Sequence, residues 1–360
     1  MIRLALVALL AAAAGQAATF EQLSAEAQNA RKMDHNDEAL PLYQQALALR
    51  PSWAEGWWDL GALLYEKGRY AEARDAFRKL IAIDAKAVAG YAVLGICEYK
   101  TAEFDAALED LDTARTLGLP TGHPIAKAAR YYLAVLLNSN GQHDAASELL
   151  LGLLQAAGKS PEVVEAVGMA GLRMAKRPEQ LSGSEAELAR KVGEALAVLG
   201  QRRVDESLAI LENLLKQYPT QPNLHYVYGE VMLESDADKA VEAFRKELEL
   251  QPGSVAAMLA MAREMERTKR LEQAHAYAQK AVTAAPADFA GHALLGRILV
   301  SMGQPKEGAG ELERARAIEP GSPQVYYALA SAYAKMGRHA DAEQARAEFL
   351  RLKKLADQEQ

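Results

Sequence analysis

The chain has 360 residues, of which 50% are hydrophobic, 6% aromatic and 25% charged, and its formal net charge is -7 at pH 7. This acidity, without a basic stripe, argues against nucleic acid as a partner, because binding a phosphate backbone requires clustered lysine and arginine. Cys97 is the single cysteine, so no disulfide can form within one chain, and we expect a buried, inert thiol.

The N-terminal residues predict export. Arg3 precedes an apolar run, Leu4–Ala14, which small residues follow. A run this short does not comfortably span the roughly 30 Å hydrocarbon core of a membrane, and the pattern is typical of a secretory signal. We therefore expect a signal peptide over residues 1–18, cleaved after Ala17 or Ala18, and a periplasmic or extracellular mature chain. The alternative is an uncleaved membrane anchor.

After residue 19 the sequence repeats with a period close to 34 residues. Ala39, Ala73 and Ala107 are 34 residues apart, as are Gly61 and Gly95. A fixed period of this length is typical of a stacked array of small units rather than of one globular fold.

Each unit is predicted to be a helix, a turn and a second helix. In the first helix a large residue is followed by an apolar and then a small residue, as in Trp57, Leu60 and Gly61. This is helical spacing, and the small residue lets a neighbouring helix approach closely. Turn signals such as residues 68–70 follow, and then a second amphipathic segment that contains Phe77. No β-branched alternation occurs, so no strands are expected.

This pattern resembles the tetratricopeptide repeat. One copy shows the matching residues Trp57, Leu60, Gly61, Tyr65, Gly68, Tyr70, Ala73, Phe77 and Asp84. Nine copies recur in phase, near 20–53, 54–87, 88–121, 127–159, 188–221, 222–254, 255–288, 289–322 and 323–352. The resemblance implies an all-α, right-handed superhelical solenoid of helix-turn-helix pairs. It also implies a concave groove, lined by the first helices, that binds peptides or protein segments, and it implies no reaction.

The repeat rhythm is interrupted once. Ser160 and Pro161 are typical of a helix start, but breaker residues follow where a second helix would be expected, and Ser184 with Glu187 matches a capping box. We therefore interpret residues 160–187 as a half repeat plus connector without a second helix. This segment is either a decayed repeat without a role, or a joint that redirects the superhelix or docks a partner.

The interruption predicts a domain organisation in four parts. They are a signal peptide (1–18), an N-terminal block of four repeats (19–159), the half repeat and connector (160–187), and a C-terminal block of five repeats with a short polar tail (188–360).

No grouped catalytic or metal-binding set is found in the sequence. The seven histidines are scattered, no H-E-x-x-H or G-x-S-x-G motif occurs, and no two histidines lie four apart on a helix. We therefore expect no enzymatic activity, no metal site and no cofactor.

The predicted partner-binding groove consists of first-helix residues that point away from the second helix of their repeat. Tyrosine, tryptophan and arginine dominate binding hot spots, and arginine can grip a carboxylate with two parallel hydrogen bonds. The groove residues are Trp58, Tyr65, Glu66, Tyr99, Lys100, Tyr131, Asn138, Tyr226, Glu230, Arg263, Arg267, Arg297 and Tyr327. In the version of the family that holds a C-terminal carboxylate, asparagine stands where Ala62 and Ile96 stand here. We therefore expect an internal peptide segment or a folded partner instead.

The sequence thus predicts a non-enzymatic protein-protein interaction scaffold of the cell envelope, with no membrane span in the mature chain. Two other hypotheses are left open. One is a module that binds glycans or another small ligand through the groove aromatics, and the other is a membrane-anchored assembly factor that retains its N-terminal run. The sequence names neither the partner nor the oligomeric state.

Overall fold

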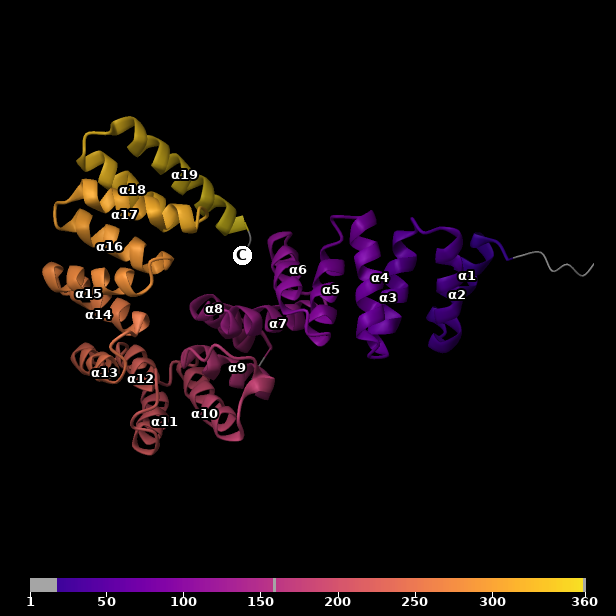
Figure 1. Ribbon diagram of the computed structural model, residues 1–360, viewed down its shortest axis with the longest axis horizontal. Coiled ribbons are helices and arrows are strands. Elements are labelled where there is room, and N and C mark those ends of the chain that lie inside the picture. The colour runs from indigo at the N-terminus through magenta and orange to yellow at the C-terminus, as the bar shows by residue number, and fades with distance from the viewer. Residues whose placement is uncertain (1–17, 158–159, 359–360) are drawn as a thin grey trace, which may run out of the picture. The chain divides into compact units, whose positions relative to one another are not determined.

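The computed structural model describes residues 18–157 and 160–358, and within them the chain is helical, with no strand (Figure 1). The all-α prediction is therefore confirmed. The chain divides into two compact units between Leu136 and Leu137, and we call them the N-terminal unit and the C-terminal unit. The predicted signal peptide, apart from Ala18, lies outside the described residues, and Thr19 caps the first helix by accepting a hydrogen bond from the Gln22 backbone N–H.

The first seven helices are α1 (Phe20–Lys32), α2 (Asn36–Leu49), α3 (Ala54–Glu66), α4 (Tyr70–Ile83), α5 (Val88–Lys100), α6 (Phe104–Thr116) and α7 (Ala126–Ser139), the last of which contains the unit boundary. They are followed by α8 (His143–Ala157), α9 (Pro161–Gly171), a 3₁₀ helix (Pro178–Gln180), α10 (Gly183–Leu199), α11 (Val204–Gln217), α12 (Leu224–Met232) and α13 (Ala237–Leu250). The C-terminal six are α14 (Val255–Arg267), α15 (Leu271–Ala284), α16 (Phe289–Ser301), α17 (Pro305–Ile318), α18 (Pro323–Lys335) and α19 (His339–Gln358).

The turn inside a helix pair passes through one residue in the left-handed conformation. Gly68 has φ of 70° and Gly303 has φ of 80° at this position, as the turn signals predicted. Ala102 (φ 64°) and Lys269 (φ 61°) adopt the same conformation without being glycine. The turn geometry is therefore set by the packing of the two helices as well as by the local residue.

The large residue at the start of a first helix ties that helix to the preceding turn. The Trp57 Nε1–H donates to the carbonyl oxygen of Pro51 at 2.8 Å, and His292 Nε2 lies 2.9 Å from the carbonyl oxygen of Pro286. The small residue that follows permits close packing: a Cβ on Gly95 would lie 2.6 Å from Cγ of Leu111 in the second helix of the same pair. These contacts explain why the sequence pattern recurs.

The sequence interpretation of residues 160–187 as a half repeat without a second helix is wrong, because α9 has a partner helix. The predicted cap Ser160 is present, but α10 begins at Gly183, capped by Ser182 with Glu185 rather than by Ser184 with Glu187. Helix α10 packs directly on α9. A Cβ on Gly168 would overlap the carbonyl oxygen of Ala189, and one on Gly193 would overlap that of Val164. The two glycines let the backbones touch, which a search for the 34-residue pattern does not detect.

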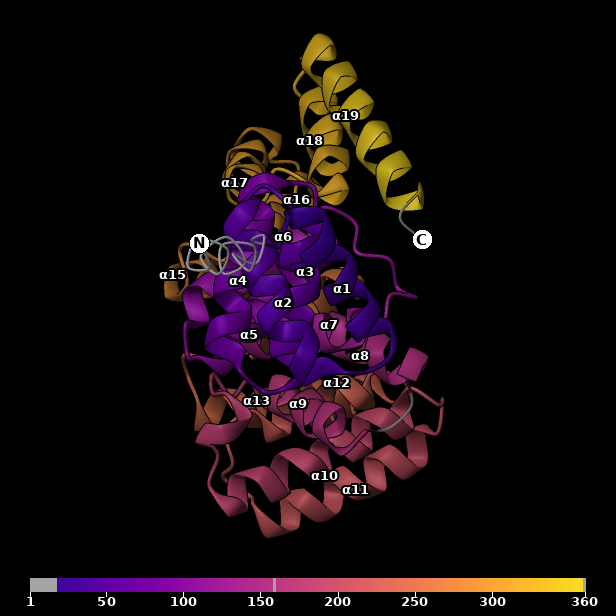
Figure 2. The same ribbon diagram turned by 90° about the vertical axis from the view of Figure 1, so that its right-hand side faces the viewer.

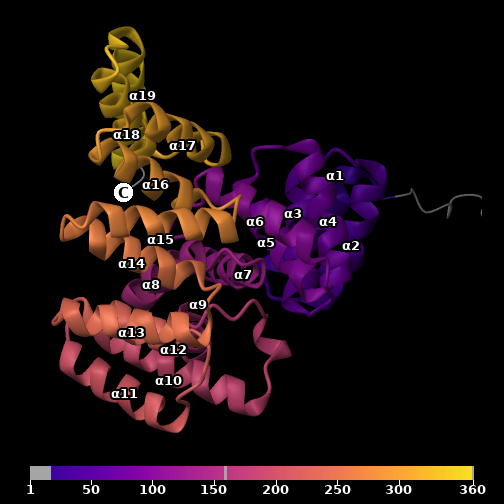
Figure 3. The same cartoon turned by 60° about the vertical axis from the view of Figure 1, so that its left-hand side comes forward.

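The C-terminal unit continues as a stack of helix pairs. Figure 2 shows α10 and α11 side by side, and Figure 3 shows the pairs α12–α13 and α14–α15 as successive layers. A continuous apolar core runs from Leu172 to Leu299, and a second cluster from Val300 to Ala345 closes the last pairs. The first helices α12, α14, α16 and α18 therefore lie on one side of this unit, and the second helices on the other. Within residues 18–157 and 160–358, no helix has the length and apolar character needed to cross a membrane.

Candidate functional site

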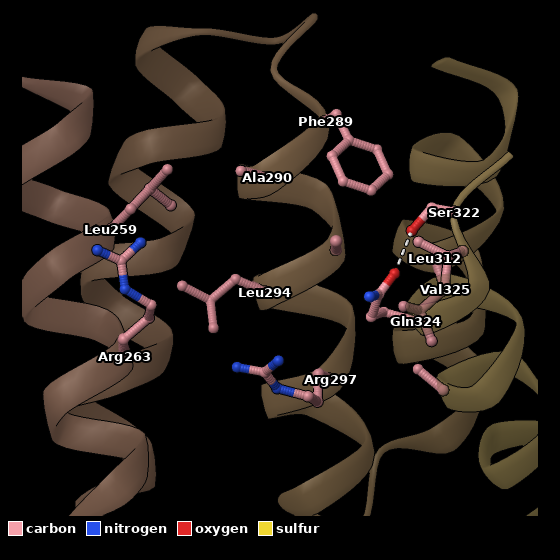
Figure 4. Close-up of a pocket in the computed structure, with 12 residues that line it drawn as sticks. Leu259, Arg263, Phe289, Ala290, Leu294, Arg297, Leu312, Ser322, Gln324 and Val325 are labelled. Atoms are coloured by element: carbon pink, nitrogen blue, oxygen red, sulfur yellow. Dashed lines mark hydrogen bonds between the residues drawn. The ribbon is translucent and has the colours of Figure 1, made fainter. Parts of the chain in front are cut away.

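A pocket of about 240 Å³ opens on the first helices α14, α16 and α18 of the C-terminal unit (Figure 4). Its floor is apolar and includes Leu259, Leu294 and Val325, while Arg263 and Arg297 stand at its rim. The full lining is Leu259, Arg263, Phe289, Ala290, Ala293, Leu294, Arg297, Leu312, Ser322, Gln324, Val325 and Ala328. It contains two arginines and no acidic residue. We call this feature the arginine-rimmed pocket.

Local helix geometry places these side chains. Residues 290, 294 and 297 follow one another at spacings of four and three, so they share one face of α16. Asp288 begins this helix by accepting a hydrogen bond from the Gly291 N–H at 2.6 Å, which sets the register of the whole face. Figure 4 shows both guanidinium groups beside Leu294.

The two rim arginines differ in their ion pairs. Arg297 donates two hydrogen bonds to the Glu266 carboxylate, from Nε at 3.0 Å and from Nη2 at 2.6 Å. Arg263 donates one, from Nη2 to Oε1 of Glu230 at 3.2 Å. Burial raises the pKa of Glu230, and the charge of Arg263 acts in the opposite direction. Arg297 thus forms a bidentate ion pair with Glu266, whereas Arg263 forms an ion pair with Glu230 through a single, longer hydrogen bond.

A third arginine, Arg173, extends this row of charges and was not predicted from the sequence. It has φ of 52°, immediately after α9, and it forms two hydrogen bonds with Asp144 at 2.9 and 3.3 Å. Its guanidinium also lies 5.7 Å from the ring centroid of Tyr226. Burial opposes ionisation of Asp144, but the hydrogen bond and charge of Arg173 outweigh it and lower the Asp144 pKa. Burial raises the pKa of Tyr226 to about 12, so its phenol is neutral at physiological pH.

Asn138 does not line a groove, contrary to the prediction. Its side chain is 2% exposed, and its Nδ2 donates to the carbonyl oxygen of Met174 at 2.6 Å. Its Oδ1 accepts from Nδ1 of His143 at 2.8 Å. Burial, followed by the charge of Arg173, lowers the His143 pKa to about 4, so this imidazole is neutral. Asn138 therefore holds in place the connector between α9 and α10 (residues 172–182), and both polar atoms of its side chain are hydrogen-bonded inside the protein.

In the N-terminal unit the predicted groove residues form a separate cluster. The Tyr99 ring lies 4.6 Å from the ring of Tyr132, and the Tyr131 ring lies 5.3 Å from it. The Lys100 ammonium lies 5.0 Å from the Tyr132 centroid. Tyr132, which the sequence prediction missed, is thus the centre of the group. It directly follows Tyr131, so the register alone did not select it.

The other predicted residues of this unit are engaged by neighbouring helices. The Trp58 ring packs edge-on against Phe77 at 5.6 Å, and the Tyr65 ring packs against Tyr70 at 5.7 Å. Glu66 forms a two-pronged ion pair with Arg31. These side chains are half-buried or paired, so they contribute to packing between repeats as well as to a surface.

Two predicted residues of the C-terminal unit lie away from the arginine-rimmed pocket. Arg267 is paired with the buried Glu264 of its own helix, and Tyr327 is 66% exposed with its ring 5.5 Å from Phe349 of α19. Of the thirteen predicted residues, only Arg263 and Arg297 line the pocket. Its apolar floor was not predicted, because core residues and floor residues share one hydrophobic pattern.

Reactive groups elsewhere are accounted for by packing. Cys97 is fully buried, and burial raises its pKa to about 12, which agrees with the expected inert thiol. Across the described ranges no group of three or more histidine, cysteine, aspartate and glutamate side chains is arranged to hold a metal ion.

Comparison with known proteins finds repeat models along the chain. A model described as tetratricopeptide repeat matches residues 24–88 and 94–161, and the middle TPR-like domain of cilia and flagella-associated protein 70 matches residues 179–353. The human protein O-mannosyl-transferase TMTC3 is 26% identical over an alignment of 234 residues, with 61% of this chain and 25% of that protein covered. The chain thus spans about a quarter of the length of this relative.

Two solved structures are also similar. MamA (41-end) from Desulfovibrio magneticus RS-1 is 21% identical, with 46% of this chain and 95% of that chain covered and a TM-score of 0.43. A thermophilic TPR protein of Thermus thermophilus, TTC0263, is 23% identical, with 45% of this chain and 89% of that chain covered and a TM-score of 0.38.

Proposed function

Because the chain belongs to the tetratricopeptide-repeat family, whose repeats indicate a protein-interaction scaffold, we propose that it binds a peptide segment or partner protein in the arginine-rimmed pocket. The observation that carries this proposal is the combination of an apolar floor with two arginines at the rim. Apolar anchors in a pocket, next to arginine, are the groups that supply most of the free energy of protein association.

We propose that the scaffold has no catalytic role of its own. The perturbed groups at the start of α8 have partners that account for them: His143 is held by Asn138, and Asp144 by Arg173. Strongly perturbed groups in a cleft would otherwise suggest catalysis. The mannosyl-transferase activity named for the human relative is not part of this proposal, because the shared stretch covers 25% of that protein.

A glycan-binding module is less well supported than a protein-binding one. Sugars stack on open aromatic faces, whereas the Trp58 and Tyr65 rings are half-buried and packed edge-on against neighbouring rings. The arginine-rimmed pocket contains one aromatic residue, Phe289, at its edge.

Export to the cell envelope is a further part of the proposal, and it rests on the apolar run Leu4–Ala14. The mass of the native protein tests it. A mature N-terminus at Ala18 or Thr19, with release in the soluble envelope fraction, is expected. Recovery of the chain from Met1 in the membrane pellet would instead support the membrane-anchored assembly factor.

Site-specific photocrosslinking tests the binding function. A photoreactive amino acid replaces Gln324, which is exposed at the pocket rim, and in a matched control replaces Gln279, which is exposed on the second helix α15. Crosslinks to discrete proteins from position 324 and not from 279 are expected. Equal crosslinking from both positions, or none from position 324, would contradict binding at the pocket.

A further inference from the structure

The arginine-rimmed pocket offers two unlike recognition elements side by side, an under-used guanidinium and an apolar cavity. We infer that it selects peptide segments in which an acidic side chain lies two positions from a bulky apolar side chain. This inference rests on the proposed function and names the chemistry of the partner.

The acidic half follows from the unequal ion pairs of the two arginines. A guanidinium has five N–H donors in a fixed fork. Arg297 uses Nε and Nη2 on Glu266, whereas Arg263 uses only Nη2, on Glu230 at 3.2 Å. The Arg263 side chain is 48% exposed, so the rest of its fork is accessible to a carboxylate from outside. Such a carboxylate can form the two parallel hydrogen bonds that Glu230 does not form.

Glu230, whose side chain is 36% exposed, holds Arg263 by one contact of 3.2 Å and is therefore a weak competitor for that position. Burial raises the pKa of Glu230, which reduces its advantage as a charged acceptor, while Arg263 opposes this effect. The pocket lining itself contains no acidic residue, and the carboxylates beside it, Glu230 and Glu266, are the ion-pair partners of the two rim arginines. The net charge of the whole chain is -7, so an acidic segment gains its attraction from this local site and not from the overall field.

The apolar half follows from the floor beside Arg263. Leu259 lies four residues before Arg263 on α14, one helical turn away, and Leu294 lies next to both guanidinium groups in Figure 4. Both leucines are almost fully buried, and they contribute apolar surface to the pocket lining.

These dimensions limit the spacing in the ligand. One helical turn is about 5.4 Å, and residues i and i+2 of an extended peptide lie about 7 Å apart on the same side. An acidic residue on Arg263 therefore places the side chain two positions away over the floor, and the side chain between them points to the opposite face. At the far end of the pocket, Gln324 accepts a hydrogen bond from the Ser322 hydroxyl, and its amide nitrogen is a donor suited to a peptide carbonyl.

The test is selection from a random linear peptide library displayed on phage, with the intact chain as bait. Enriched peptides should carry Asp or Glu two positions from Leu, Ile, Phe or Met. Arg263→Glu should replace this preference with Lys or Arg at the same position. The matched control is Arg245→Glu, at an exposed arginine on the second helix α13, and it should leave the selection unchanged. Thermal melting confirms that each variant folds.

An enriched peptide is then synthesised with and without its acidic residue. Replacing that residue by alanine, or Arg263 by alanine, should each weaken binding by about tenfold or more, and the two losses should not add. Enriched peptides without acidic residues, or an acidic preference that survives Arg263→Glu, would overturn this inference while leaving the proposed function intact. No enrichment above background would contradict both.

Discussion

Two buried carboxylates, one in each unit, have different partners. In the C-terminal unit, fully buried Glu247 accepts hydrogen bonds from the backbone N–H groups of Asn223 and Tyr226 and from the Gln251 amide. In the N-terminal unit, Glu98 is 1% exposed, and its Oε1 accepts from Arg78 at 2.7 Å. Its Oε2 has no hydrogen-bond donor.

The N-terminal unit places a titratable carboxyl group beside Glu98. Asp110 of α6 is within hydrogen-bonding reach of Glu98, and its pKa is raised to about 7 by burial, by that hydrogen bond and by the Glu98 charge. The charge of Glu109 adds to the effect, and that of Arg78 opposes it. A protonated Asp110 donates to the buried carboxylate, which an ionised one cannot do. The comparison teaches that one repeat architecture can satisfy a buried carboxylate with fixed backbone donors or with a titratable neighbour.

The largest expected effect concerns packing in the C-terminal unit. Gly168→Ala places a Cβ 1.7 Å from the backbone carbonyl oxygen of Ala189. This overlap cannot be relieved by a change of side-chain rotamer, because the atom that it meets belongs to the backbone. We expect a loss of about 3 kcal/mol in the free energy of unfolding, concentrated in α9, α10 and their neighbours. A Cβ in Gly95→Ala meets Cγ of Leu111 at 2.6 Å and no backbone atom closer than 3.1 Å, so this change in the N-terminal unit should cost less, about 1 kcal/mol. Hydrogen exchange resolved by helix measures both, and equal losses would show that the α9–α10 contact is not special.

The next effect concerns the connector after α9. Asn138→Ala leaves the carbonyl of Met174 and Nδ1 of His143 without their partner, so we expect a cost of about 2 kcal/mol. Asn140→Ala, at an exposed position two residues away, is the control and should cost under about 0.5 kcal/mol. Chemical denaturation measures both variants. Similar values for the two would remove the structural role given to Asn138.

The sign of the pH effect separates the two units further. The pKa of Asp110 is higher in the folded chain than its ordinary value of 3.8, so protonation favours folding. This contribution is fully present below about pH 4 and is lost as the pH rises towards 7. Asp110→Asn, whose amide donates without titrating, should stabilise the N-terminal unit by about 1 to 2 kcal/mol at pH 8 and change little at pH 4. Glu109→Gln, at an exposed neighbour, should show a smaller change. Unfolding curves at pH 4 and pH 8 measure the effect of each variant on stability. A pH-independent effect of Asp110→Asn would rule out a proton on Asp110 that stabilises the fold beside Glu98.

The smallest effect concerns the turns. Ala102→Gly should stabilise the N-terminal unit by about 0.5 to 1 kcal/mol, because φ of 64° strains alanine and not glycine. The reverse change, Gly68→Ala at φ of 70°, should destabilise by a similar amount. Thermal melting of the two variants checks this. A lower melting temperature for Ala102→Gly would mean that the methyl group of Ala102 packs favourably.

Features set by short-range chemistry were predictable from the sequence. The period placed the helix pairs, Gly68 marked its turn, and Ser160 marked the start of α9. Features that depend on contacts between distant residues were not. The close approach of Gly168 and Gly193 has no counterpart in the repeat pattern, so the α9–α10 pair was missed.

The site shows the same division. The register selected Arg263 and Arg297, but it could not show that Arg297 is matched by two hydrogen bonds and Arg263 by one. Arg173 follows α9, in the interrupted segment, where the register gives no position. Asn138 occupies a groove position in the register, yet its partner is a backbone carbonyl in the connector, which side-chain patterns do not encode.

Hydrogen-deuterium exchange of the intact chain, with and without an enriched peptide, most directly tests where the partner binds. Binding in the arginine-rimmed pocket predicts slower exchange in α14, α16 and α18, and no change around Tyr99 and Tyr132 in α5 and α7. Protection confined to α5 and α7, with α14 to α18 unchanged, would contradict the pocket as the binding site and would assign binding to the aromatic cluster of the N-terminal unit.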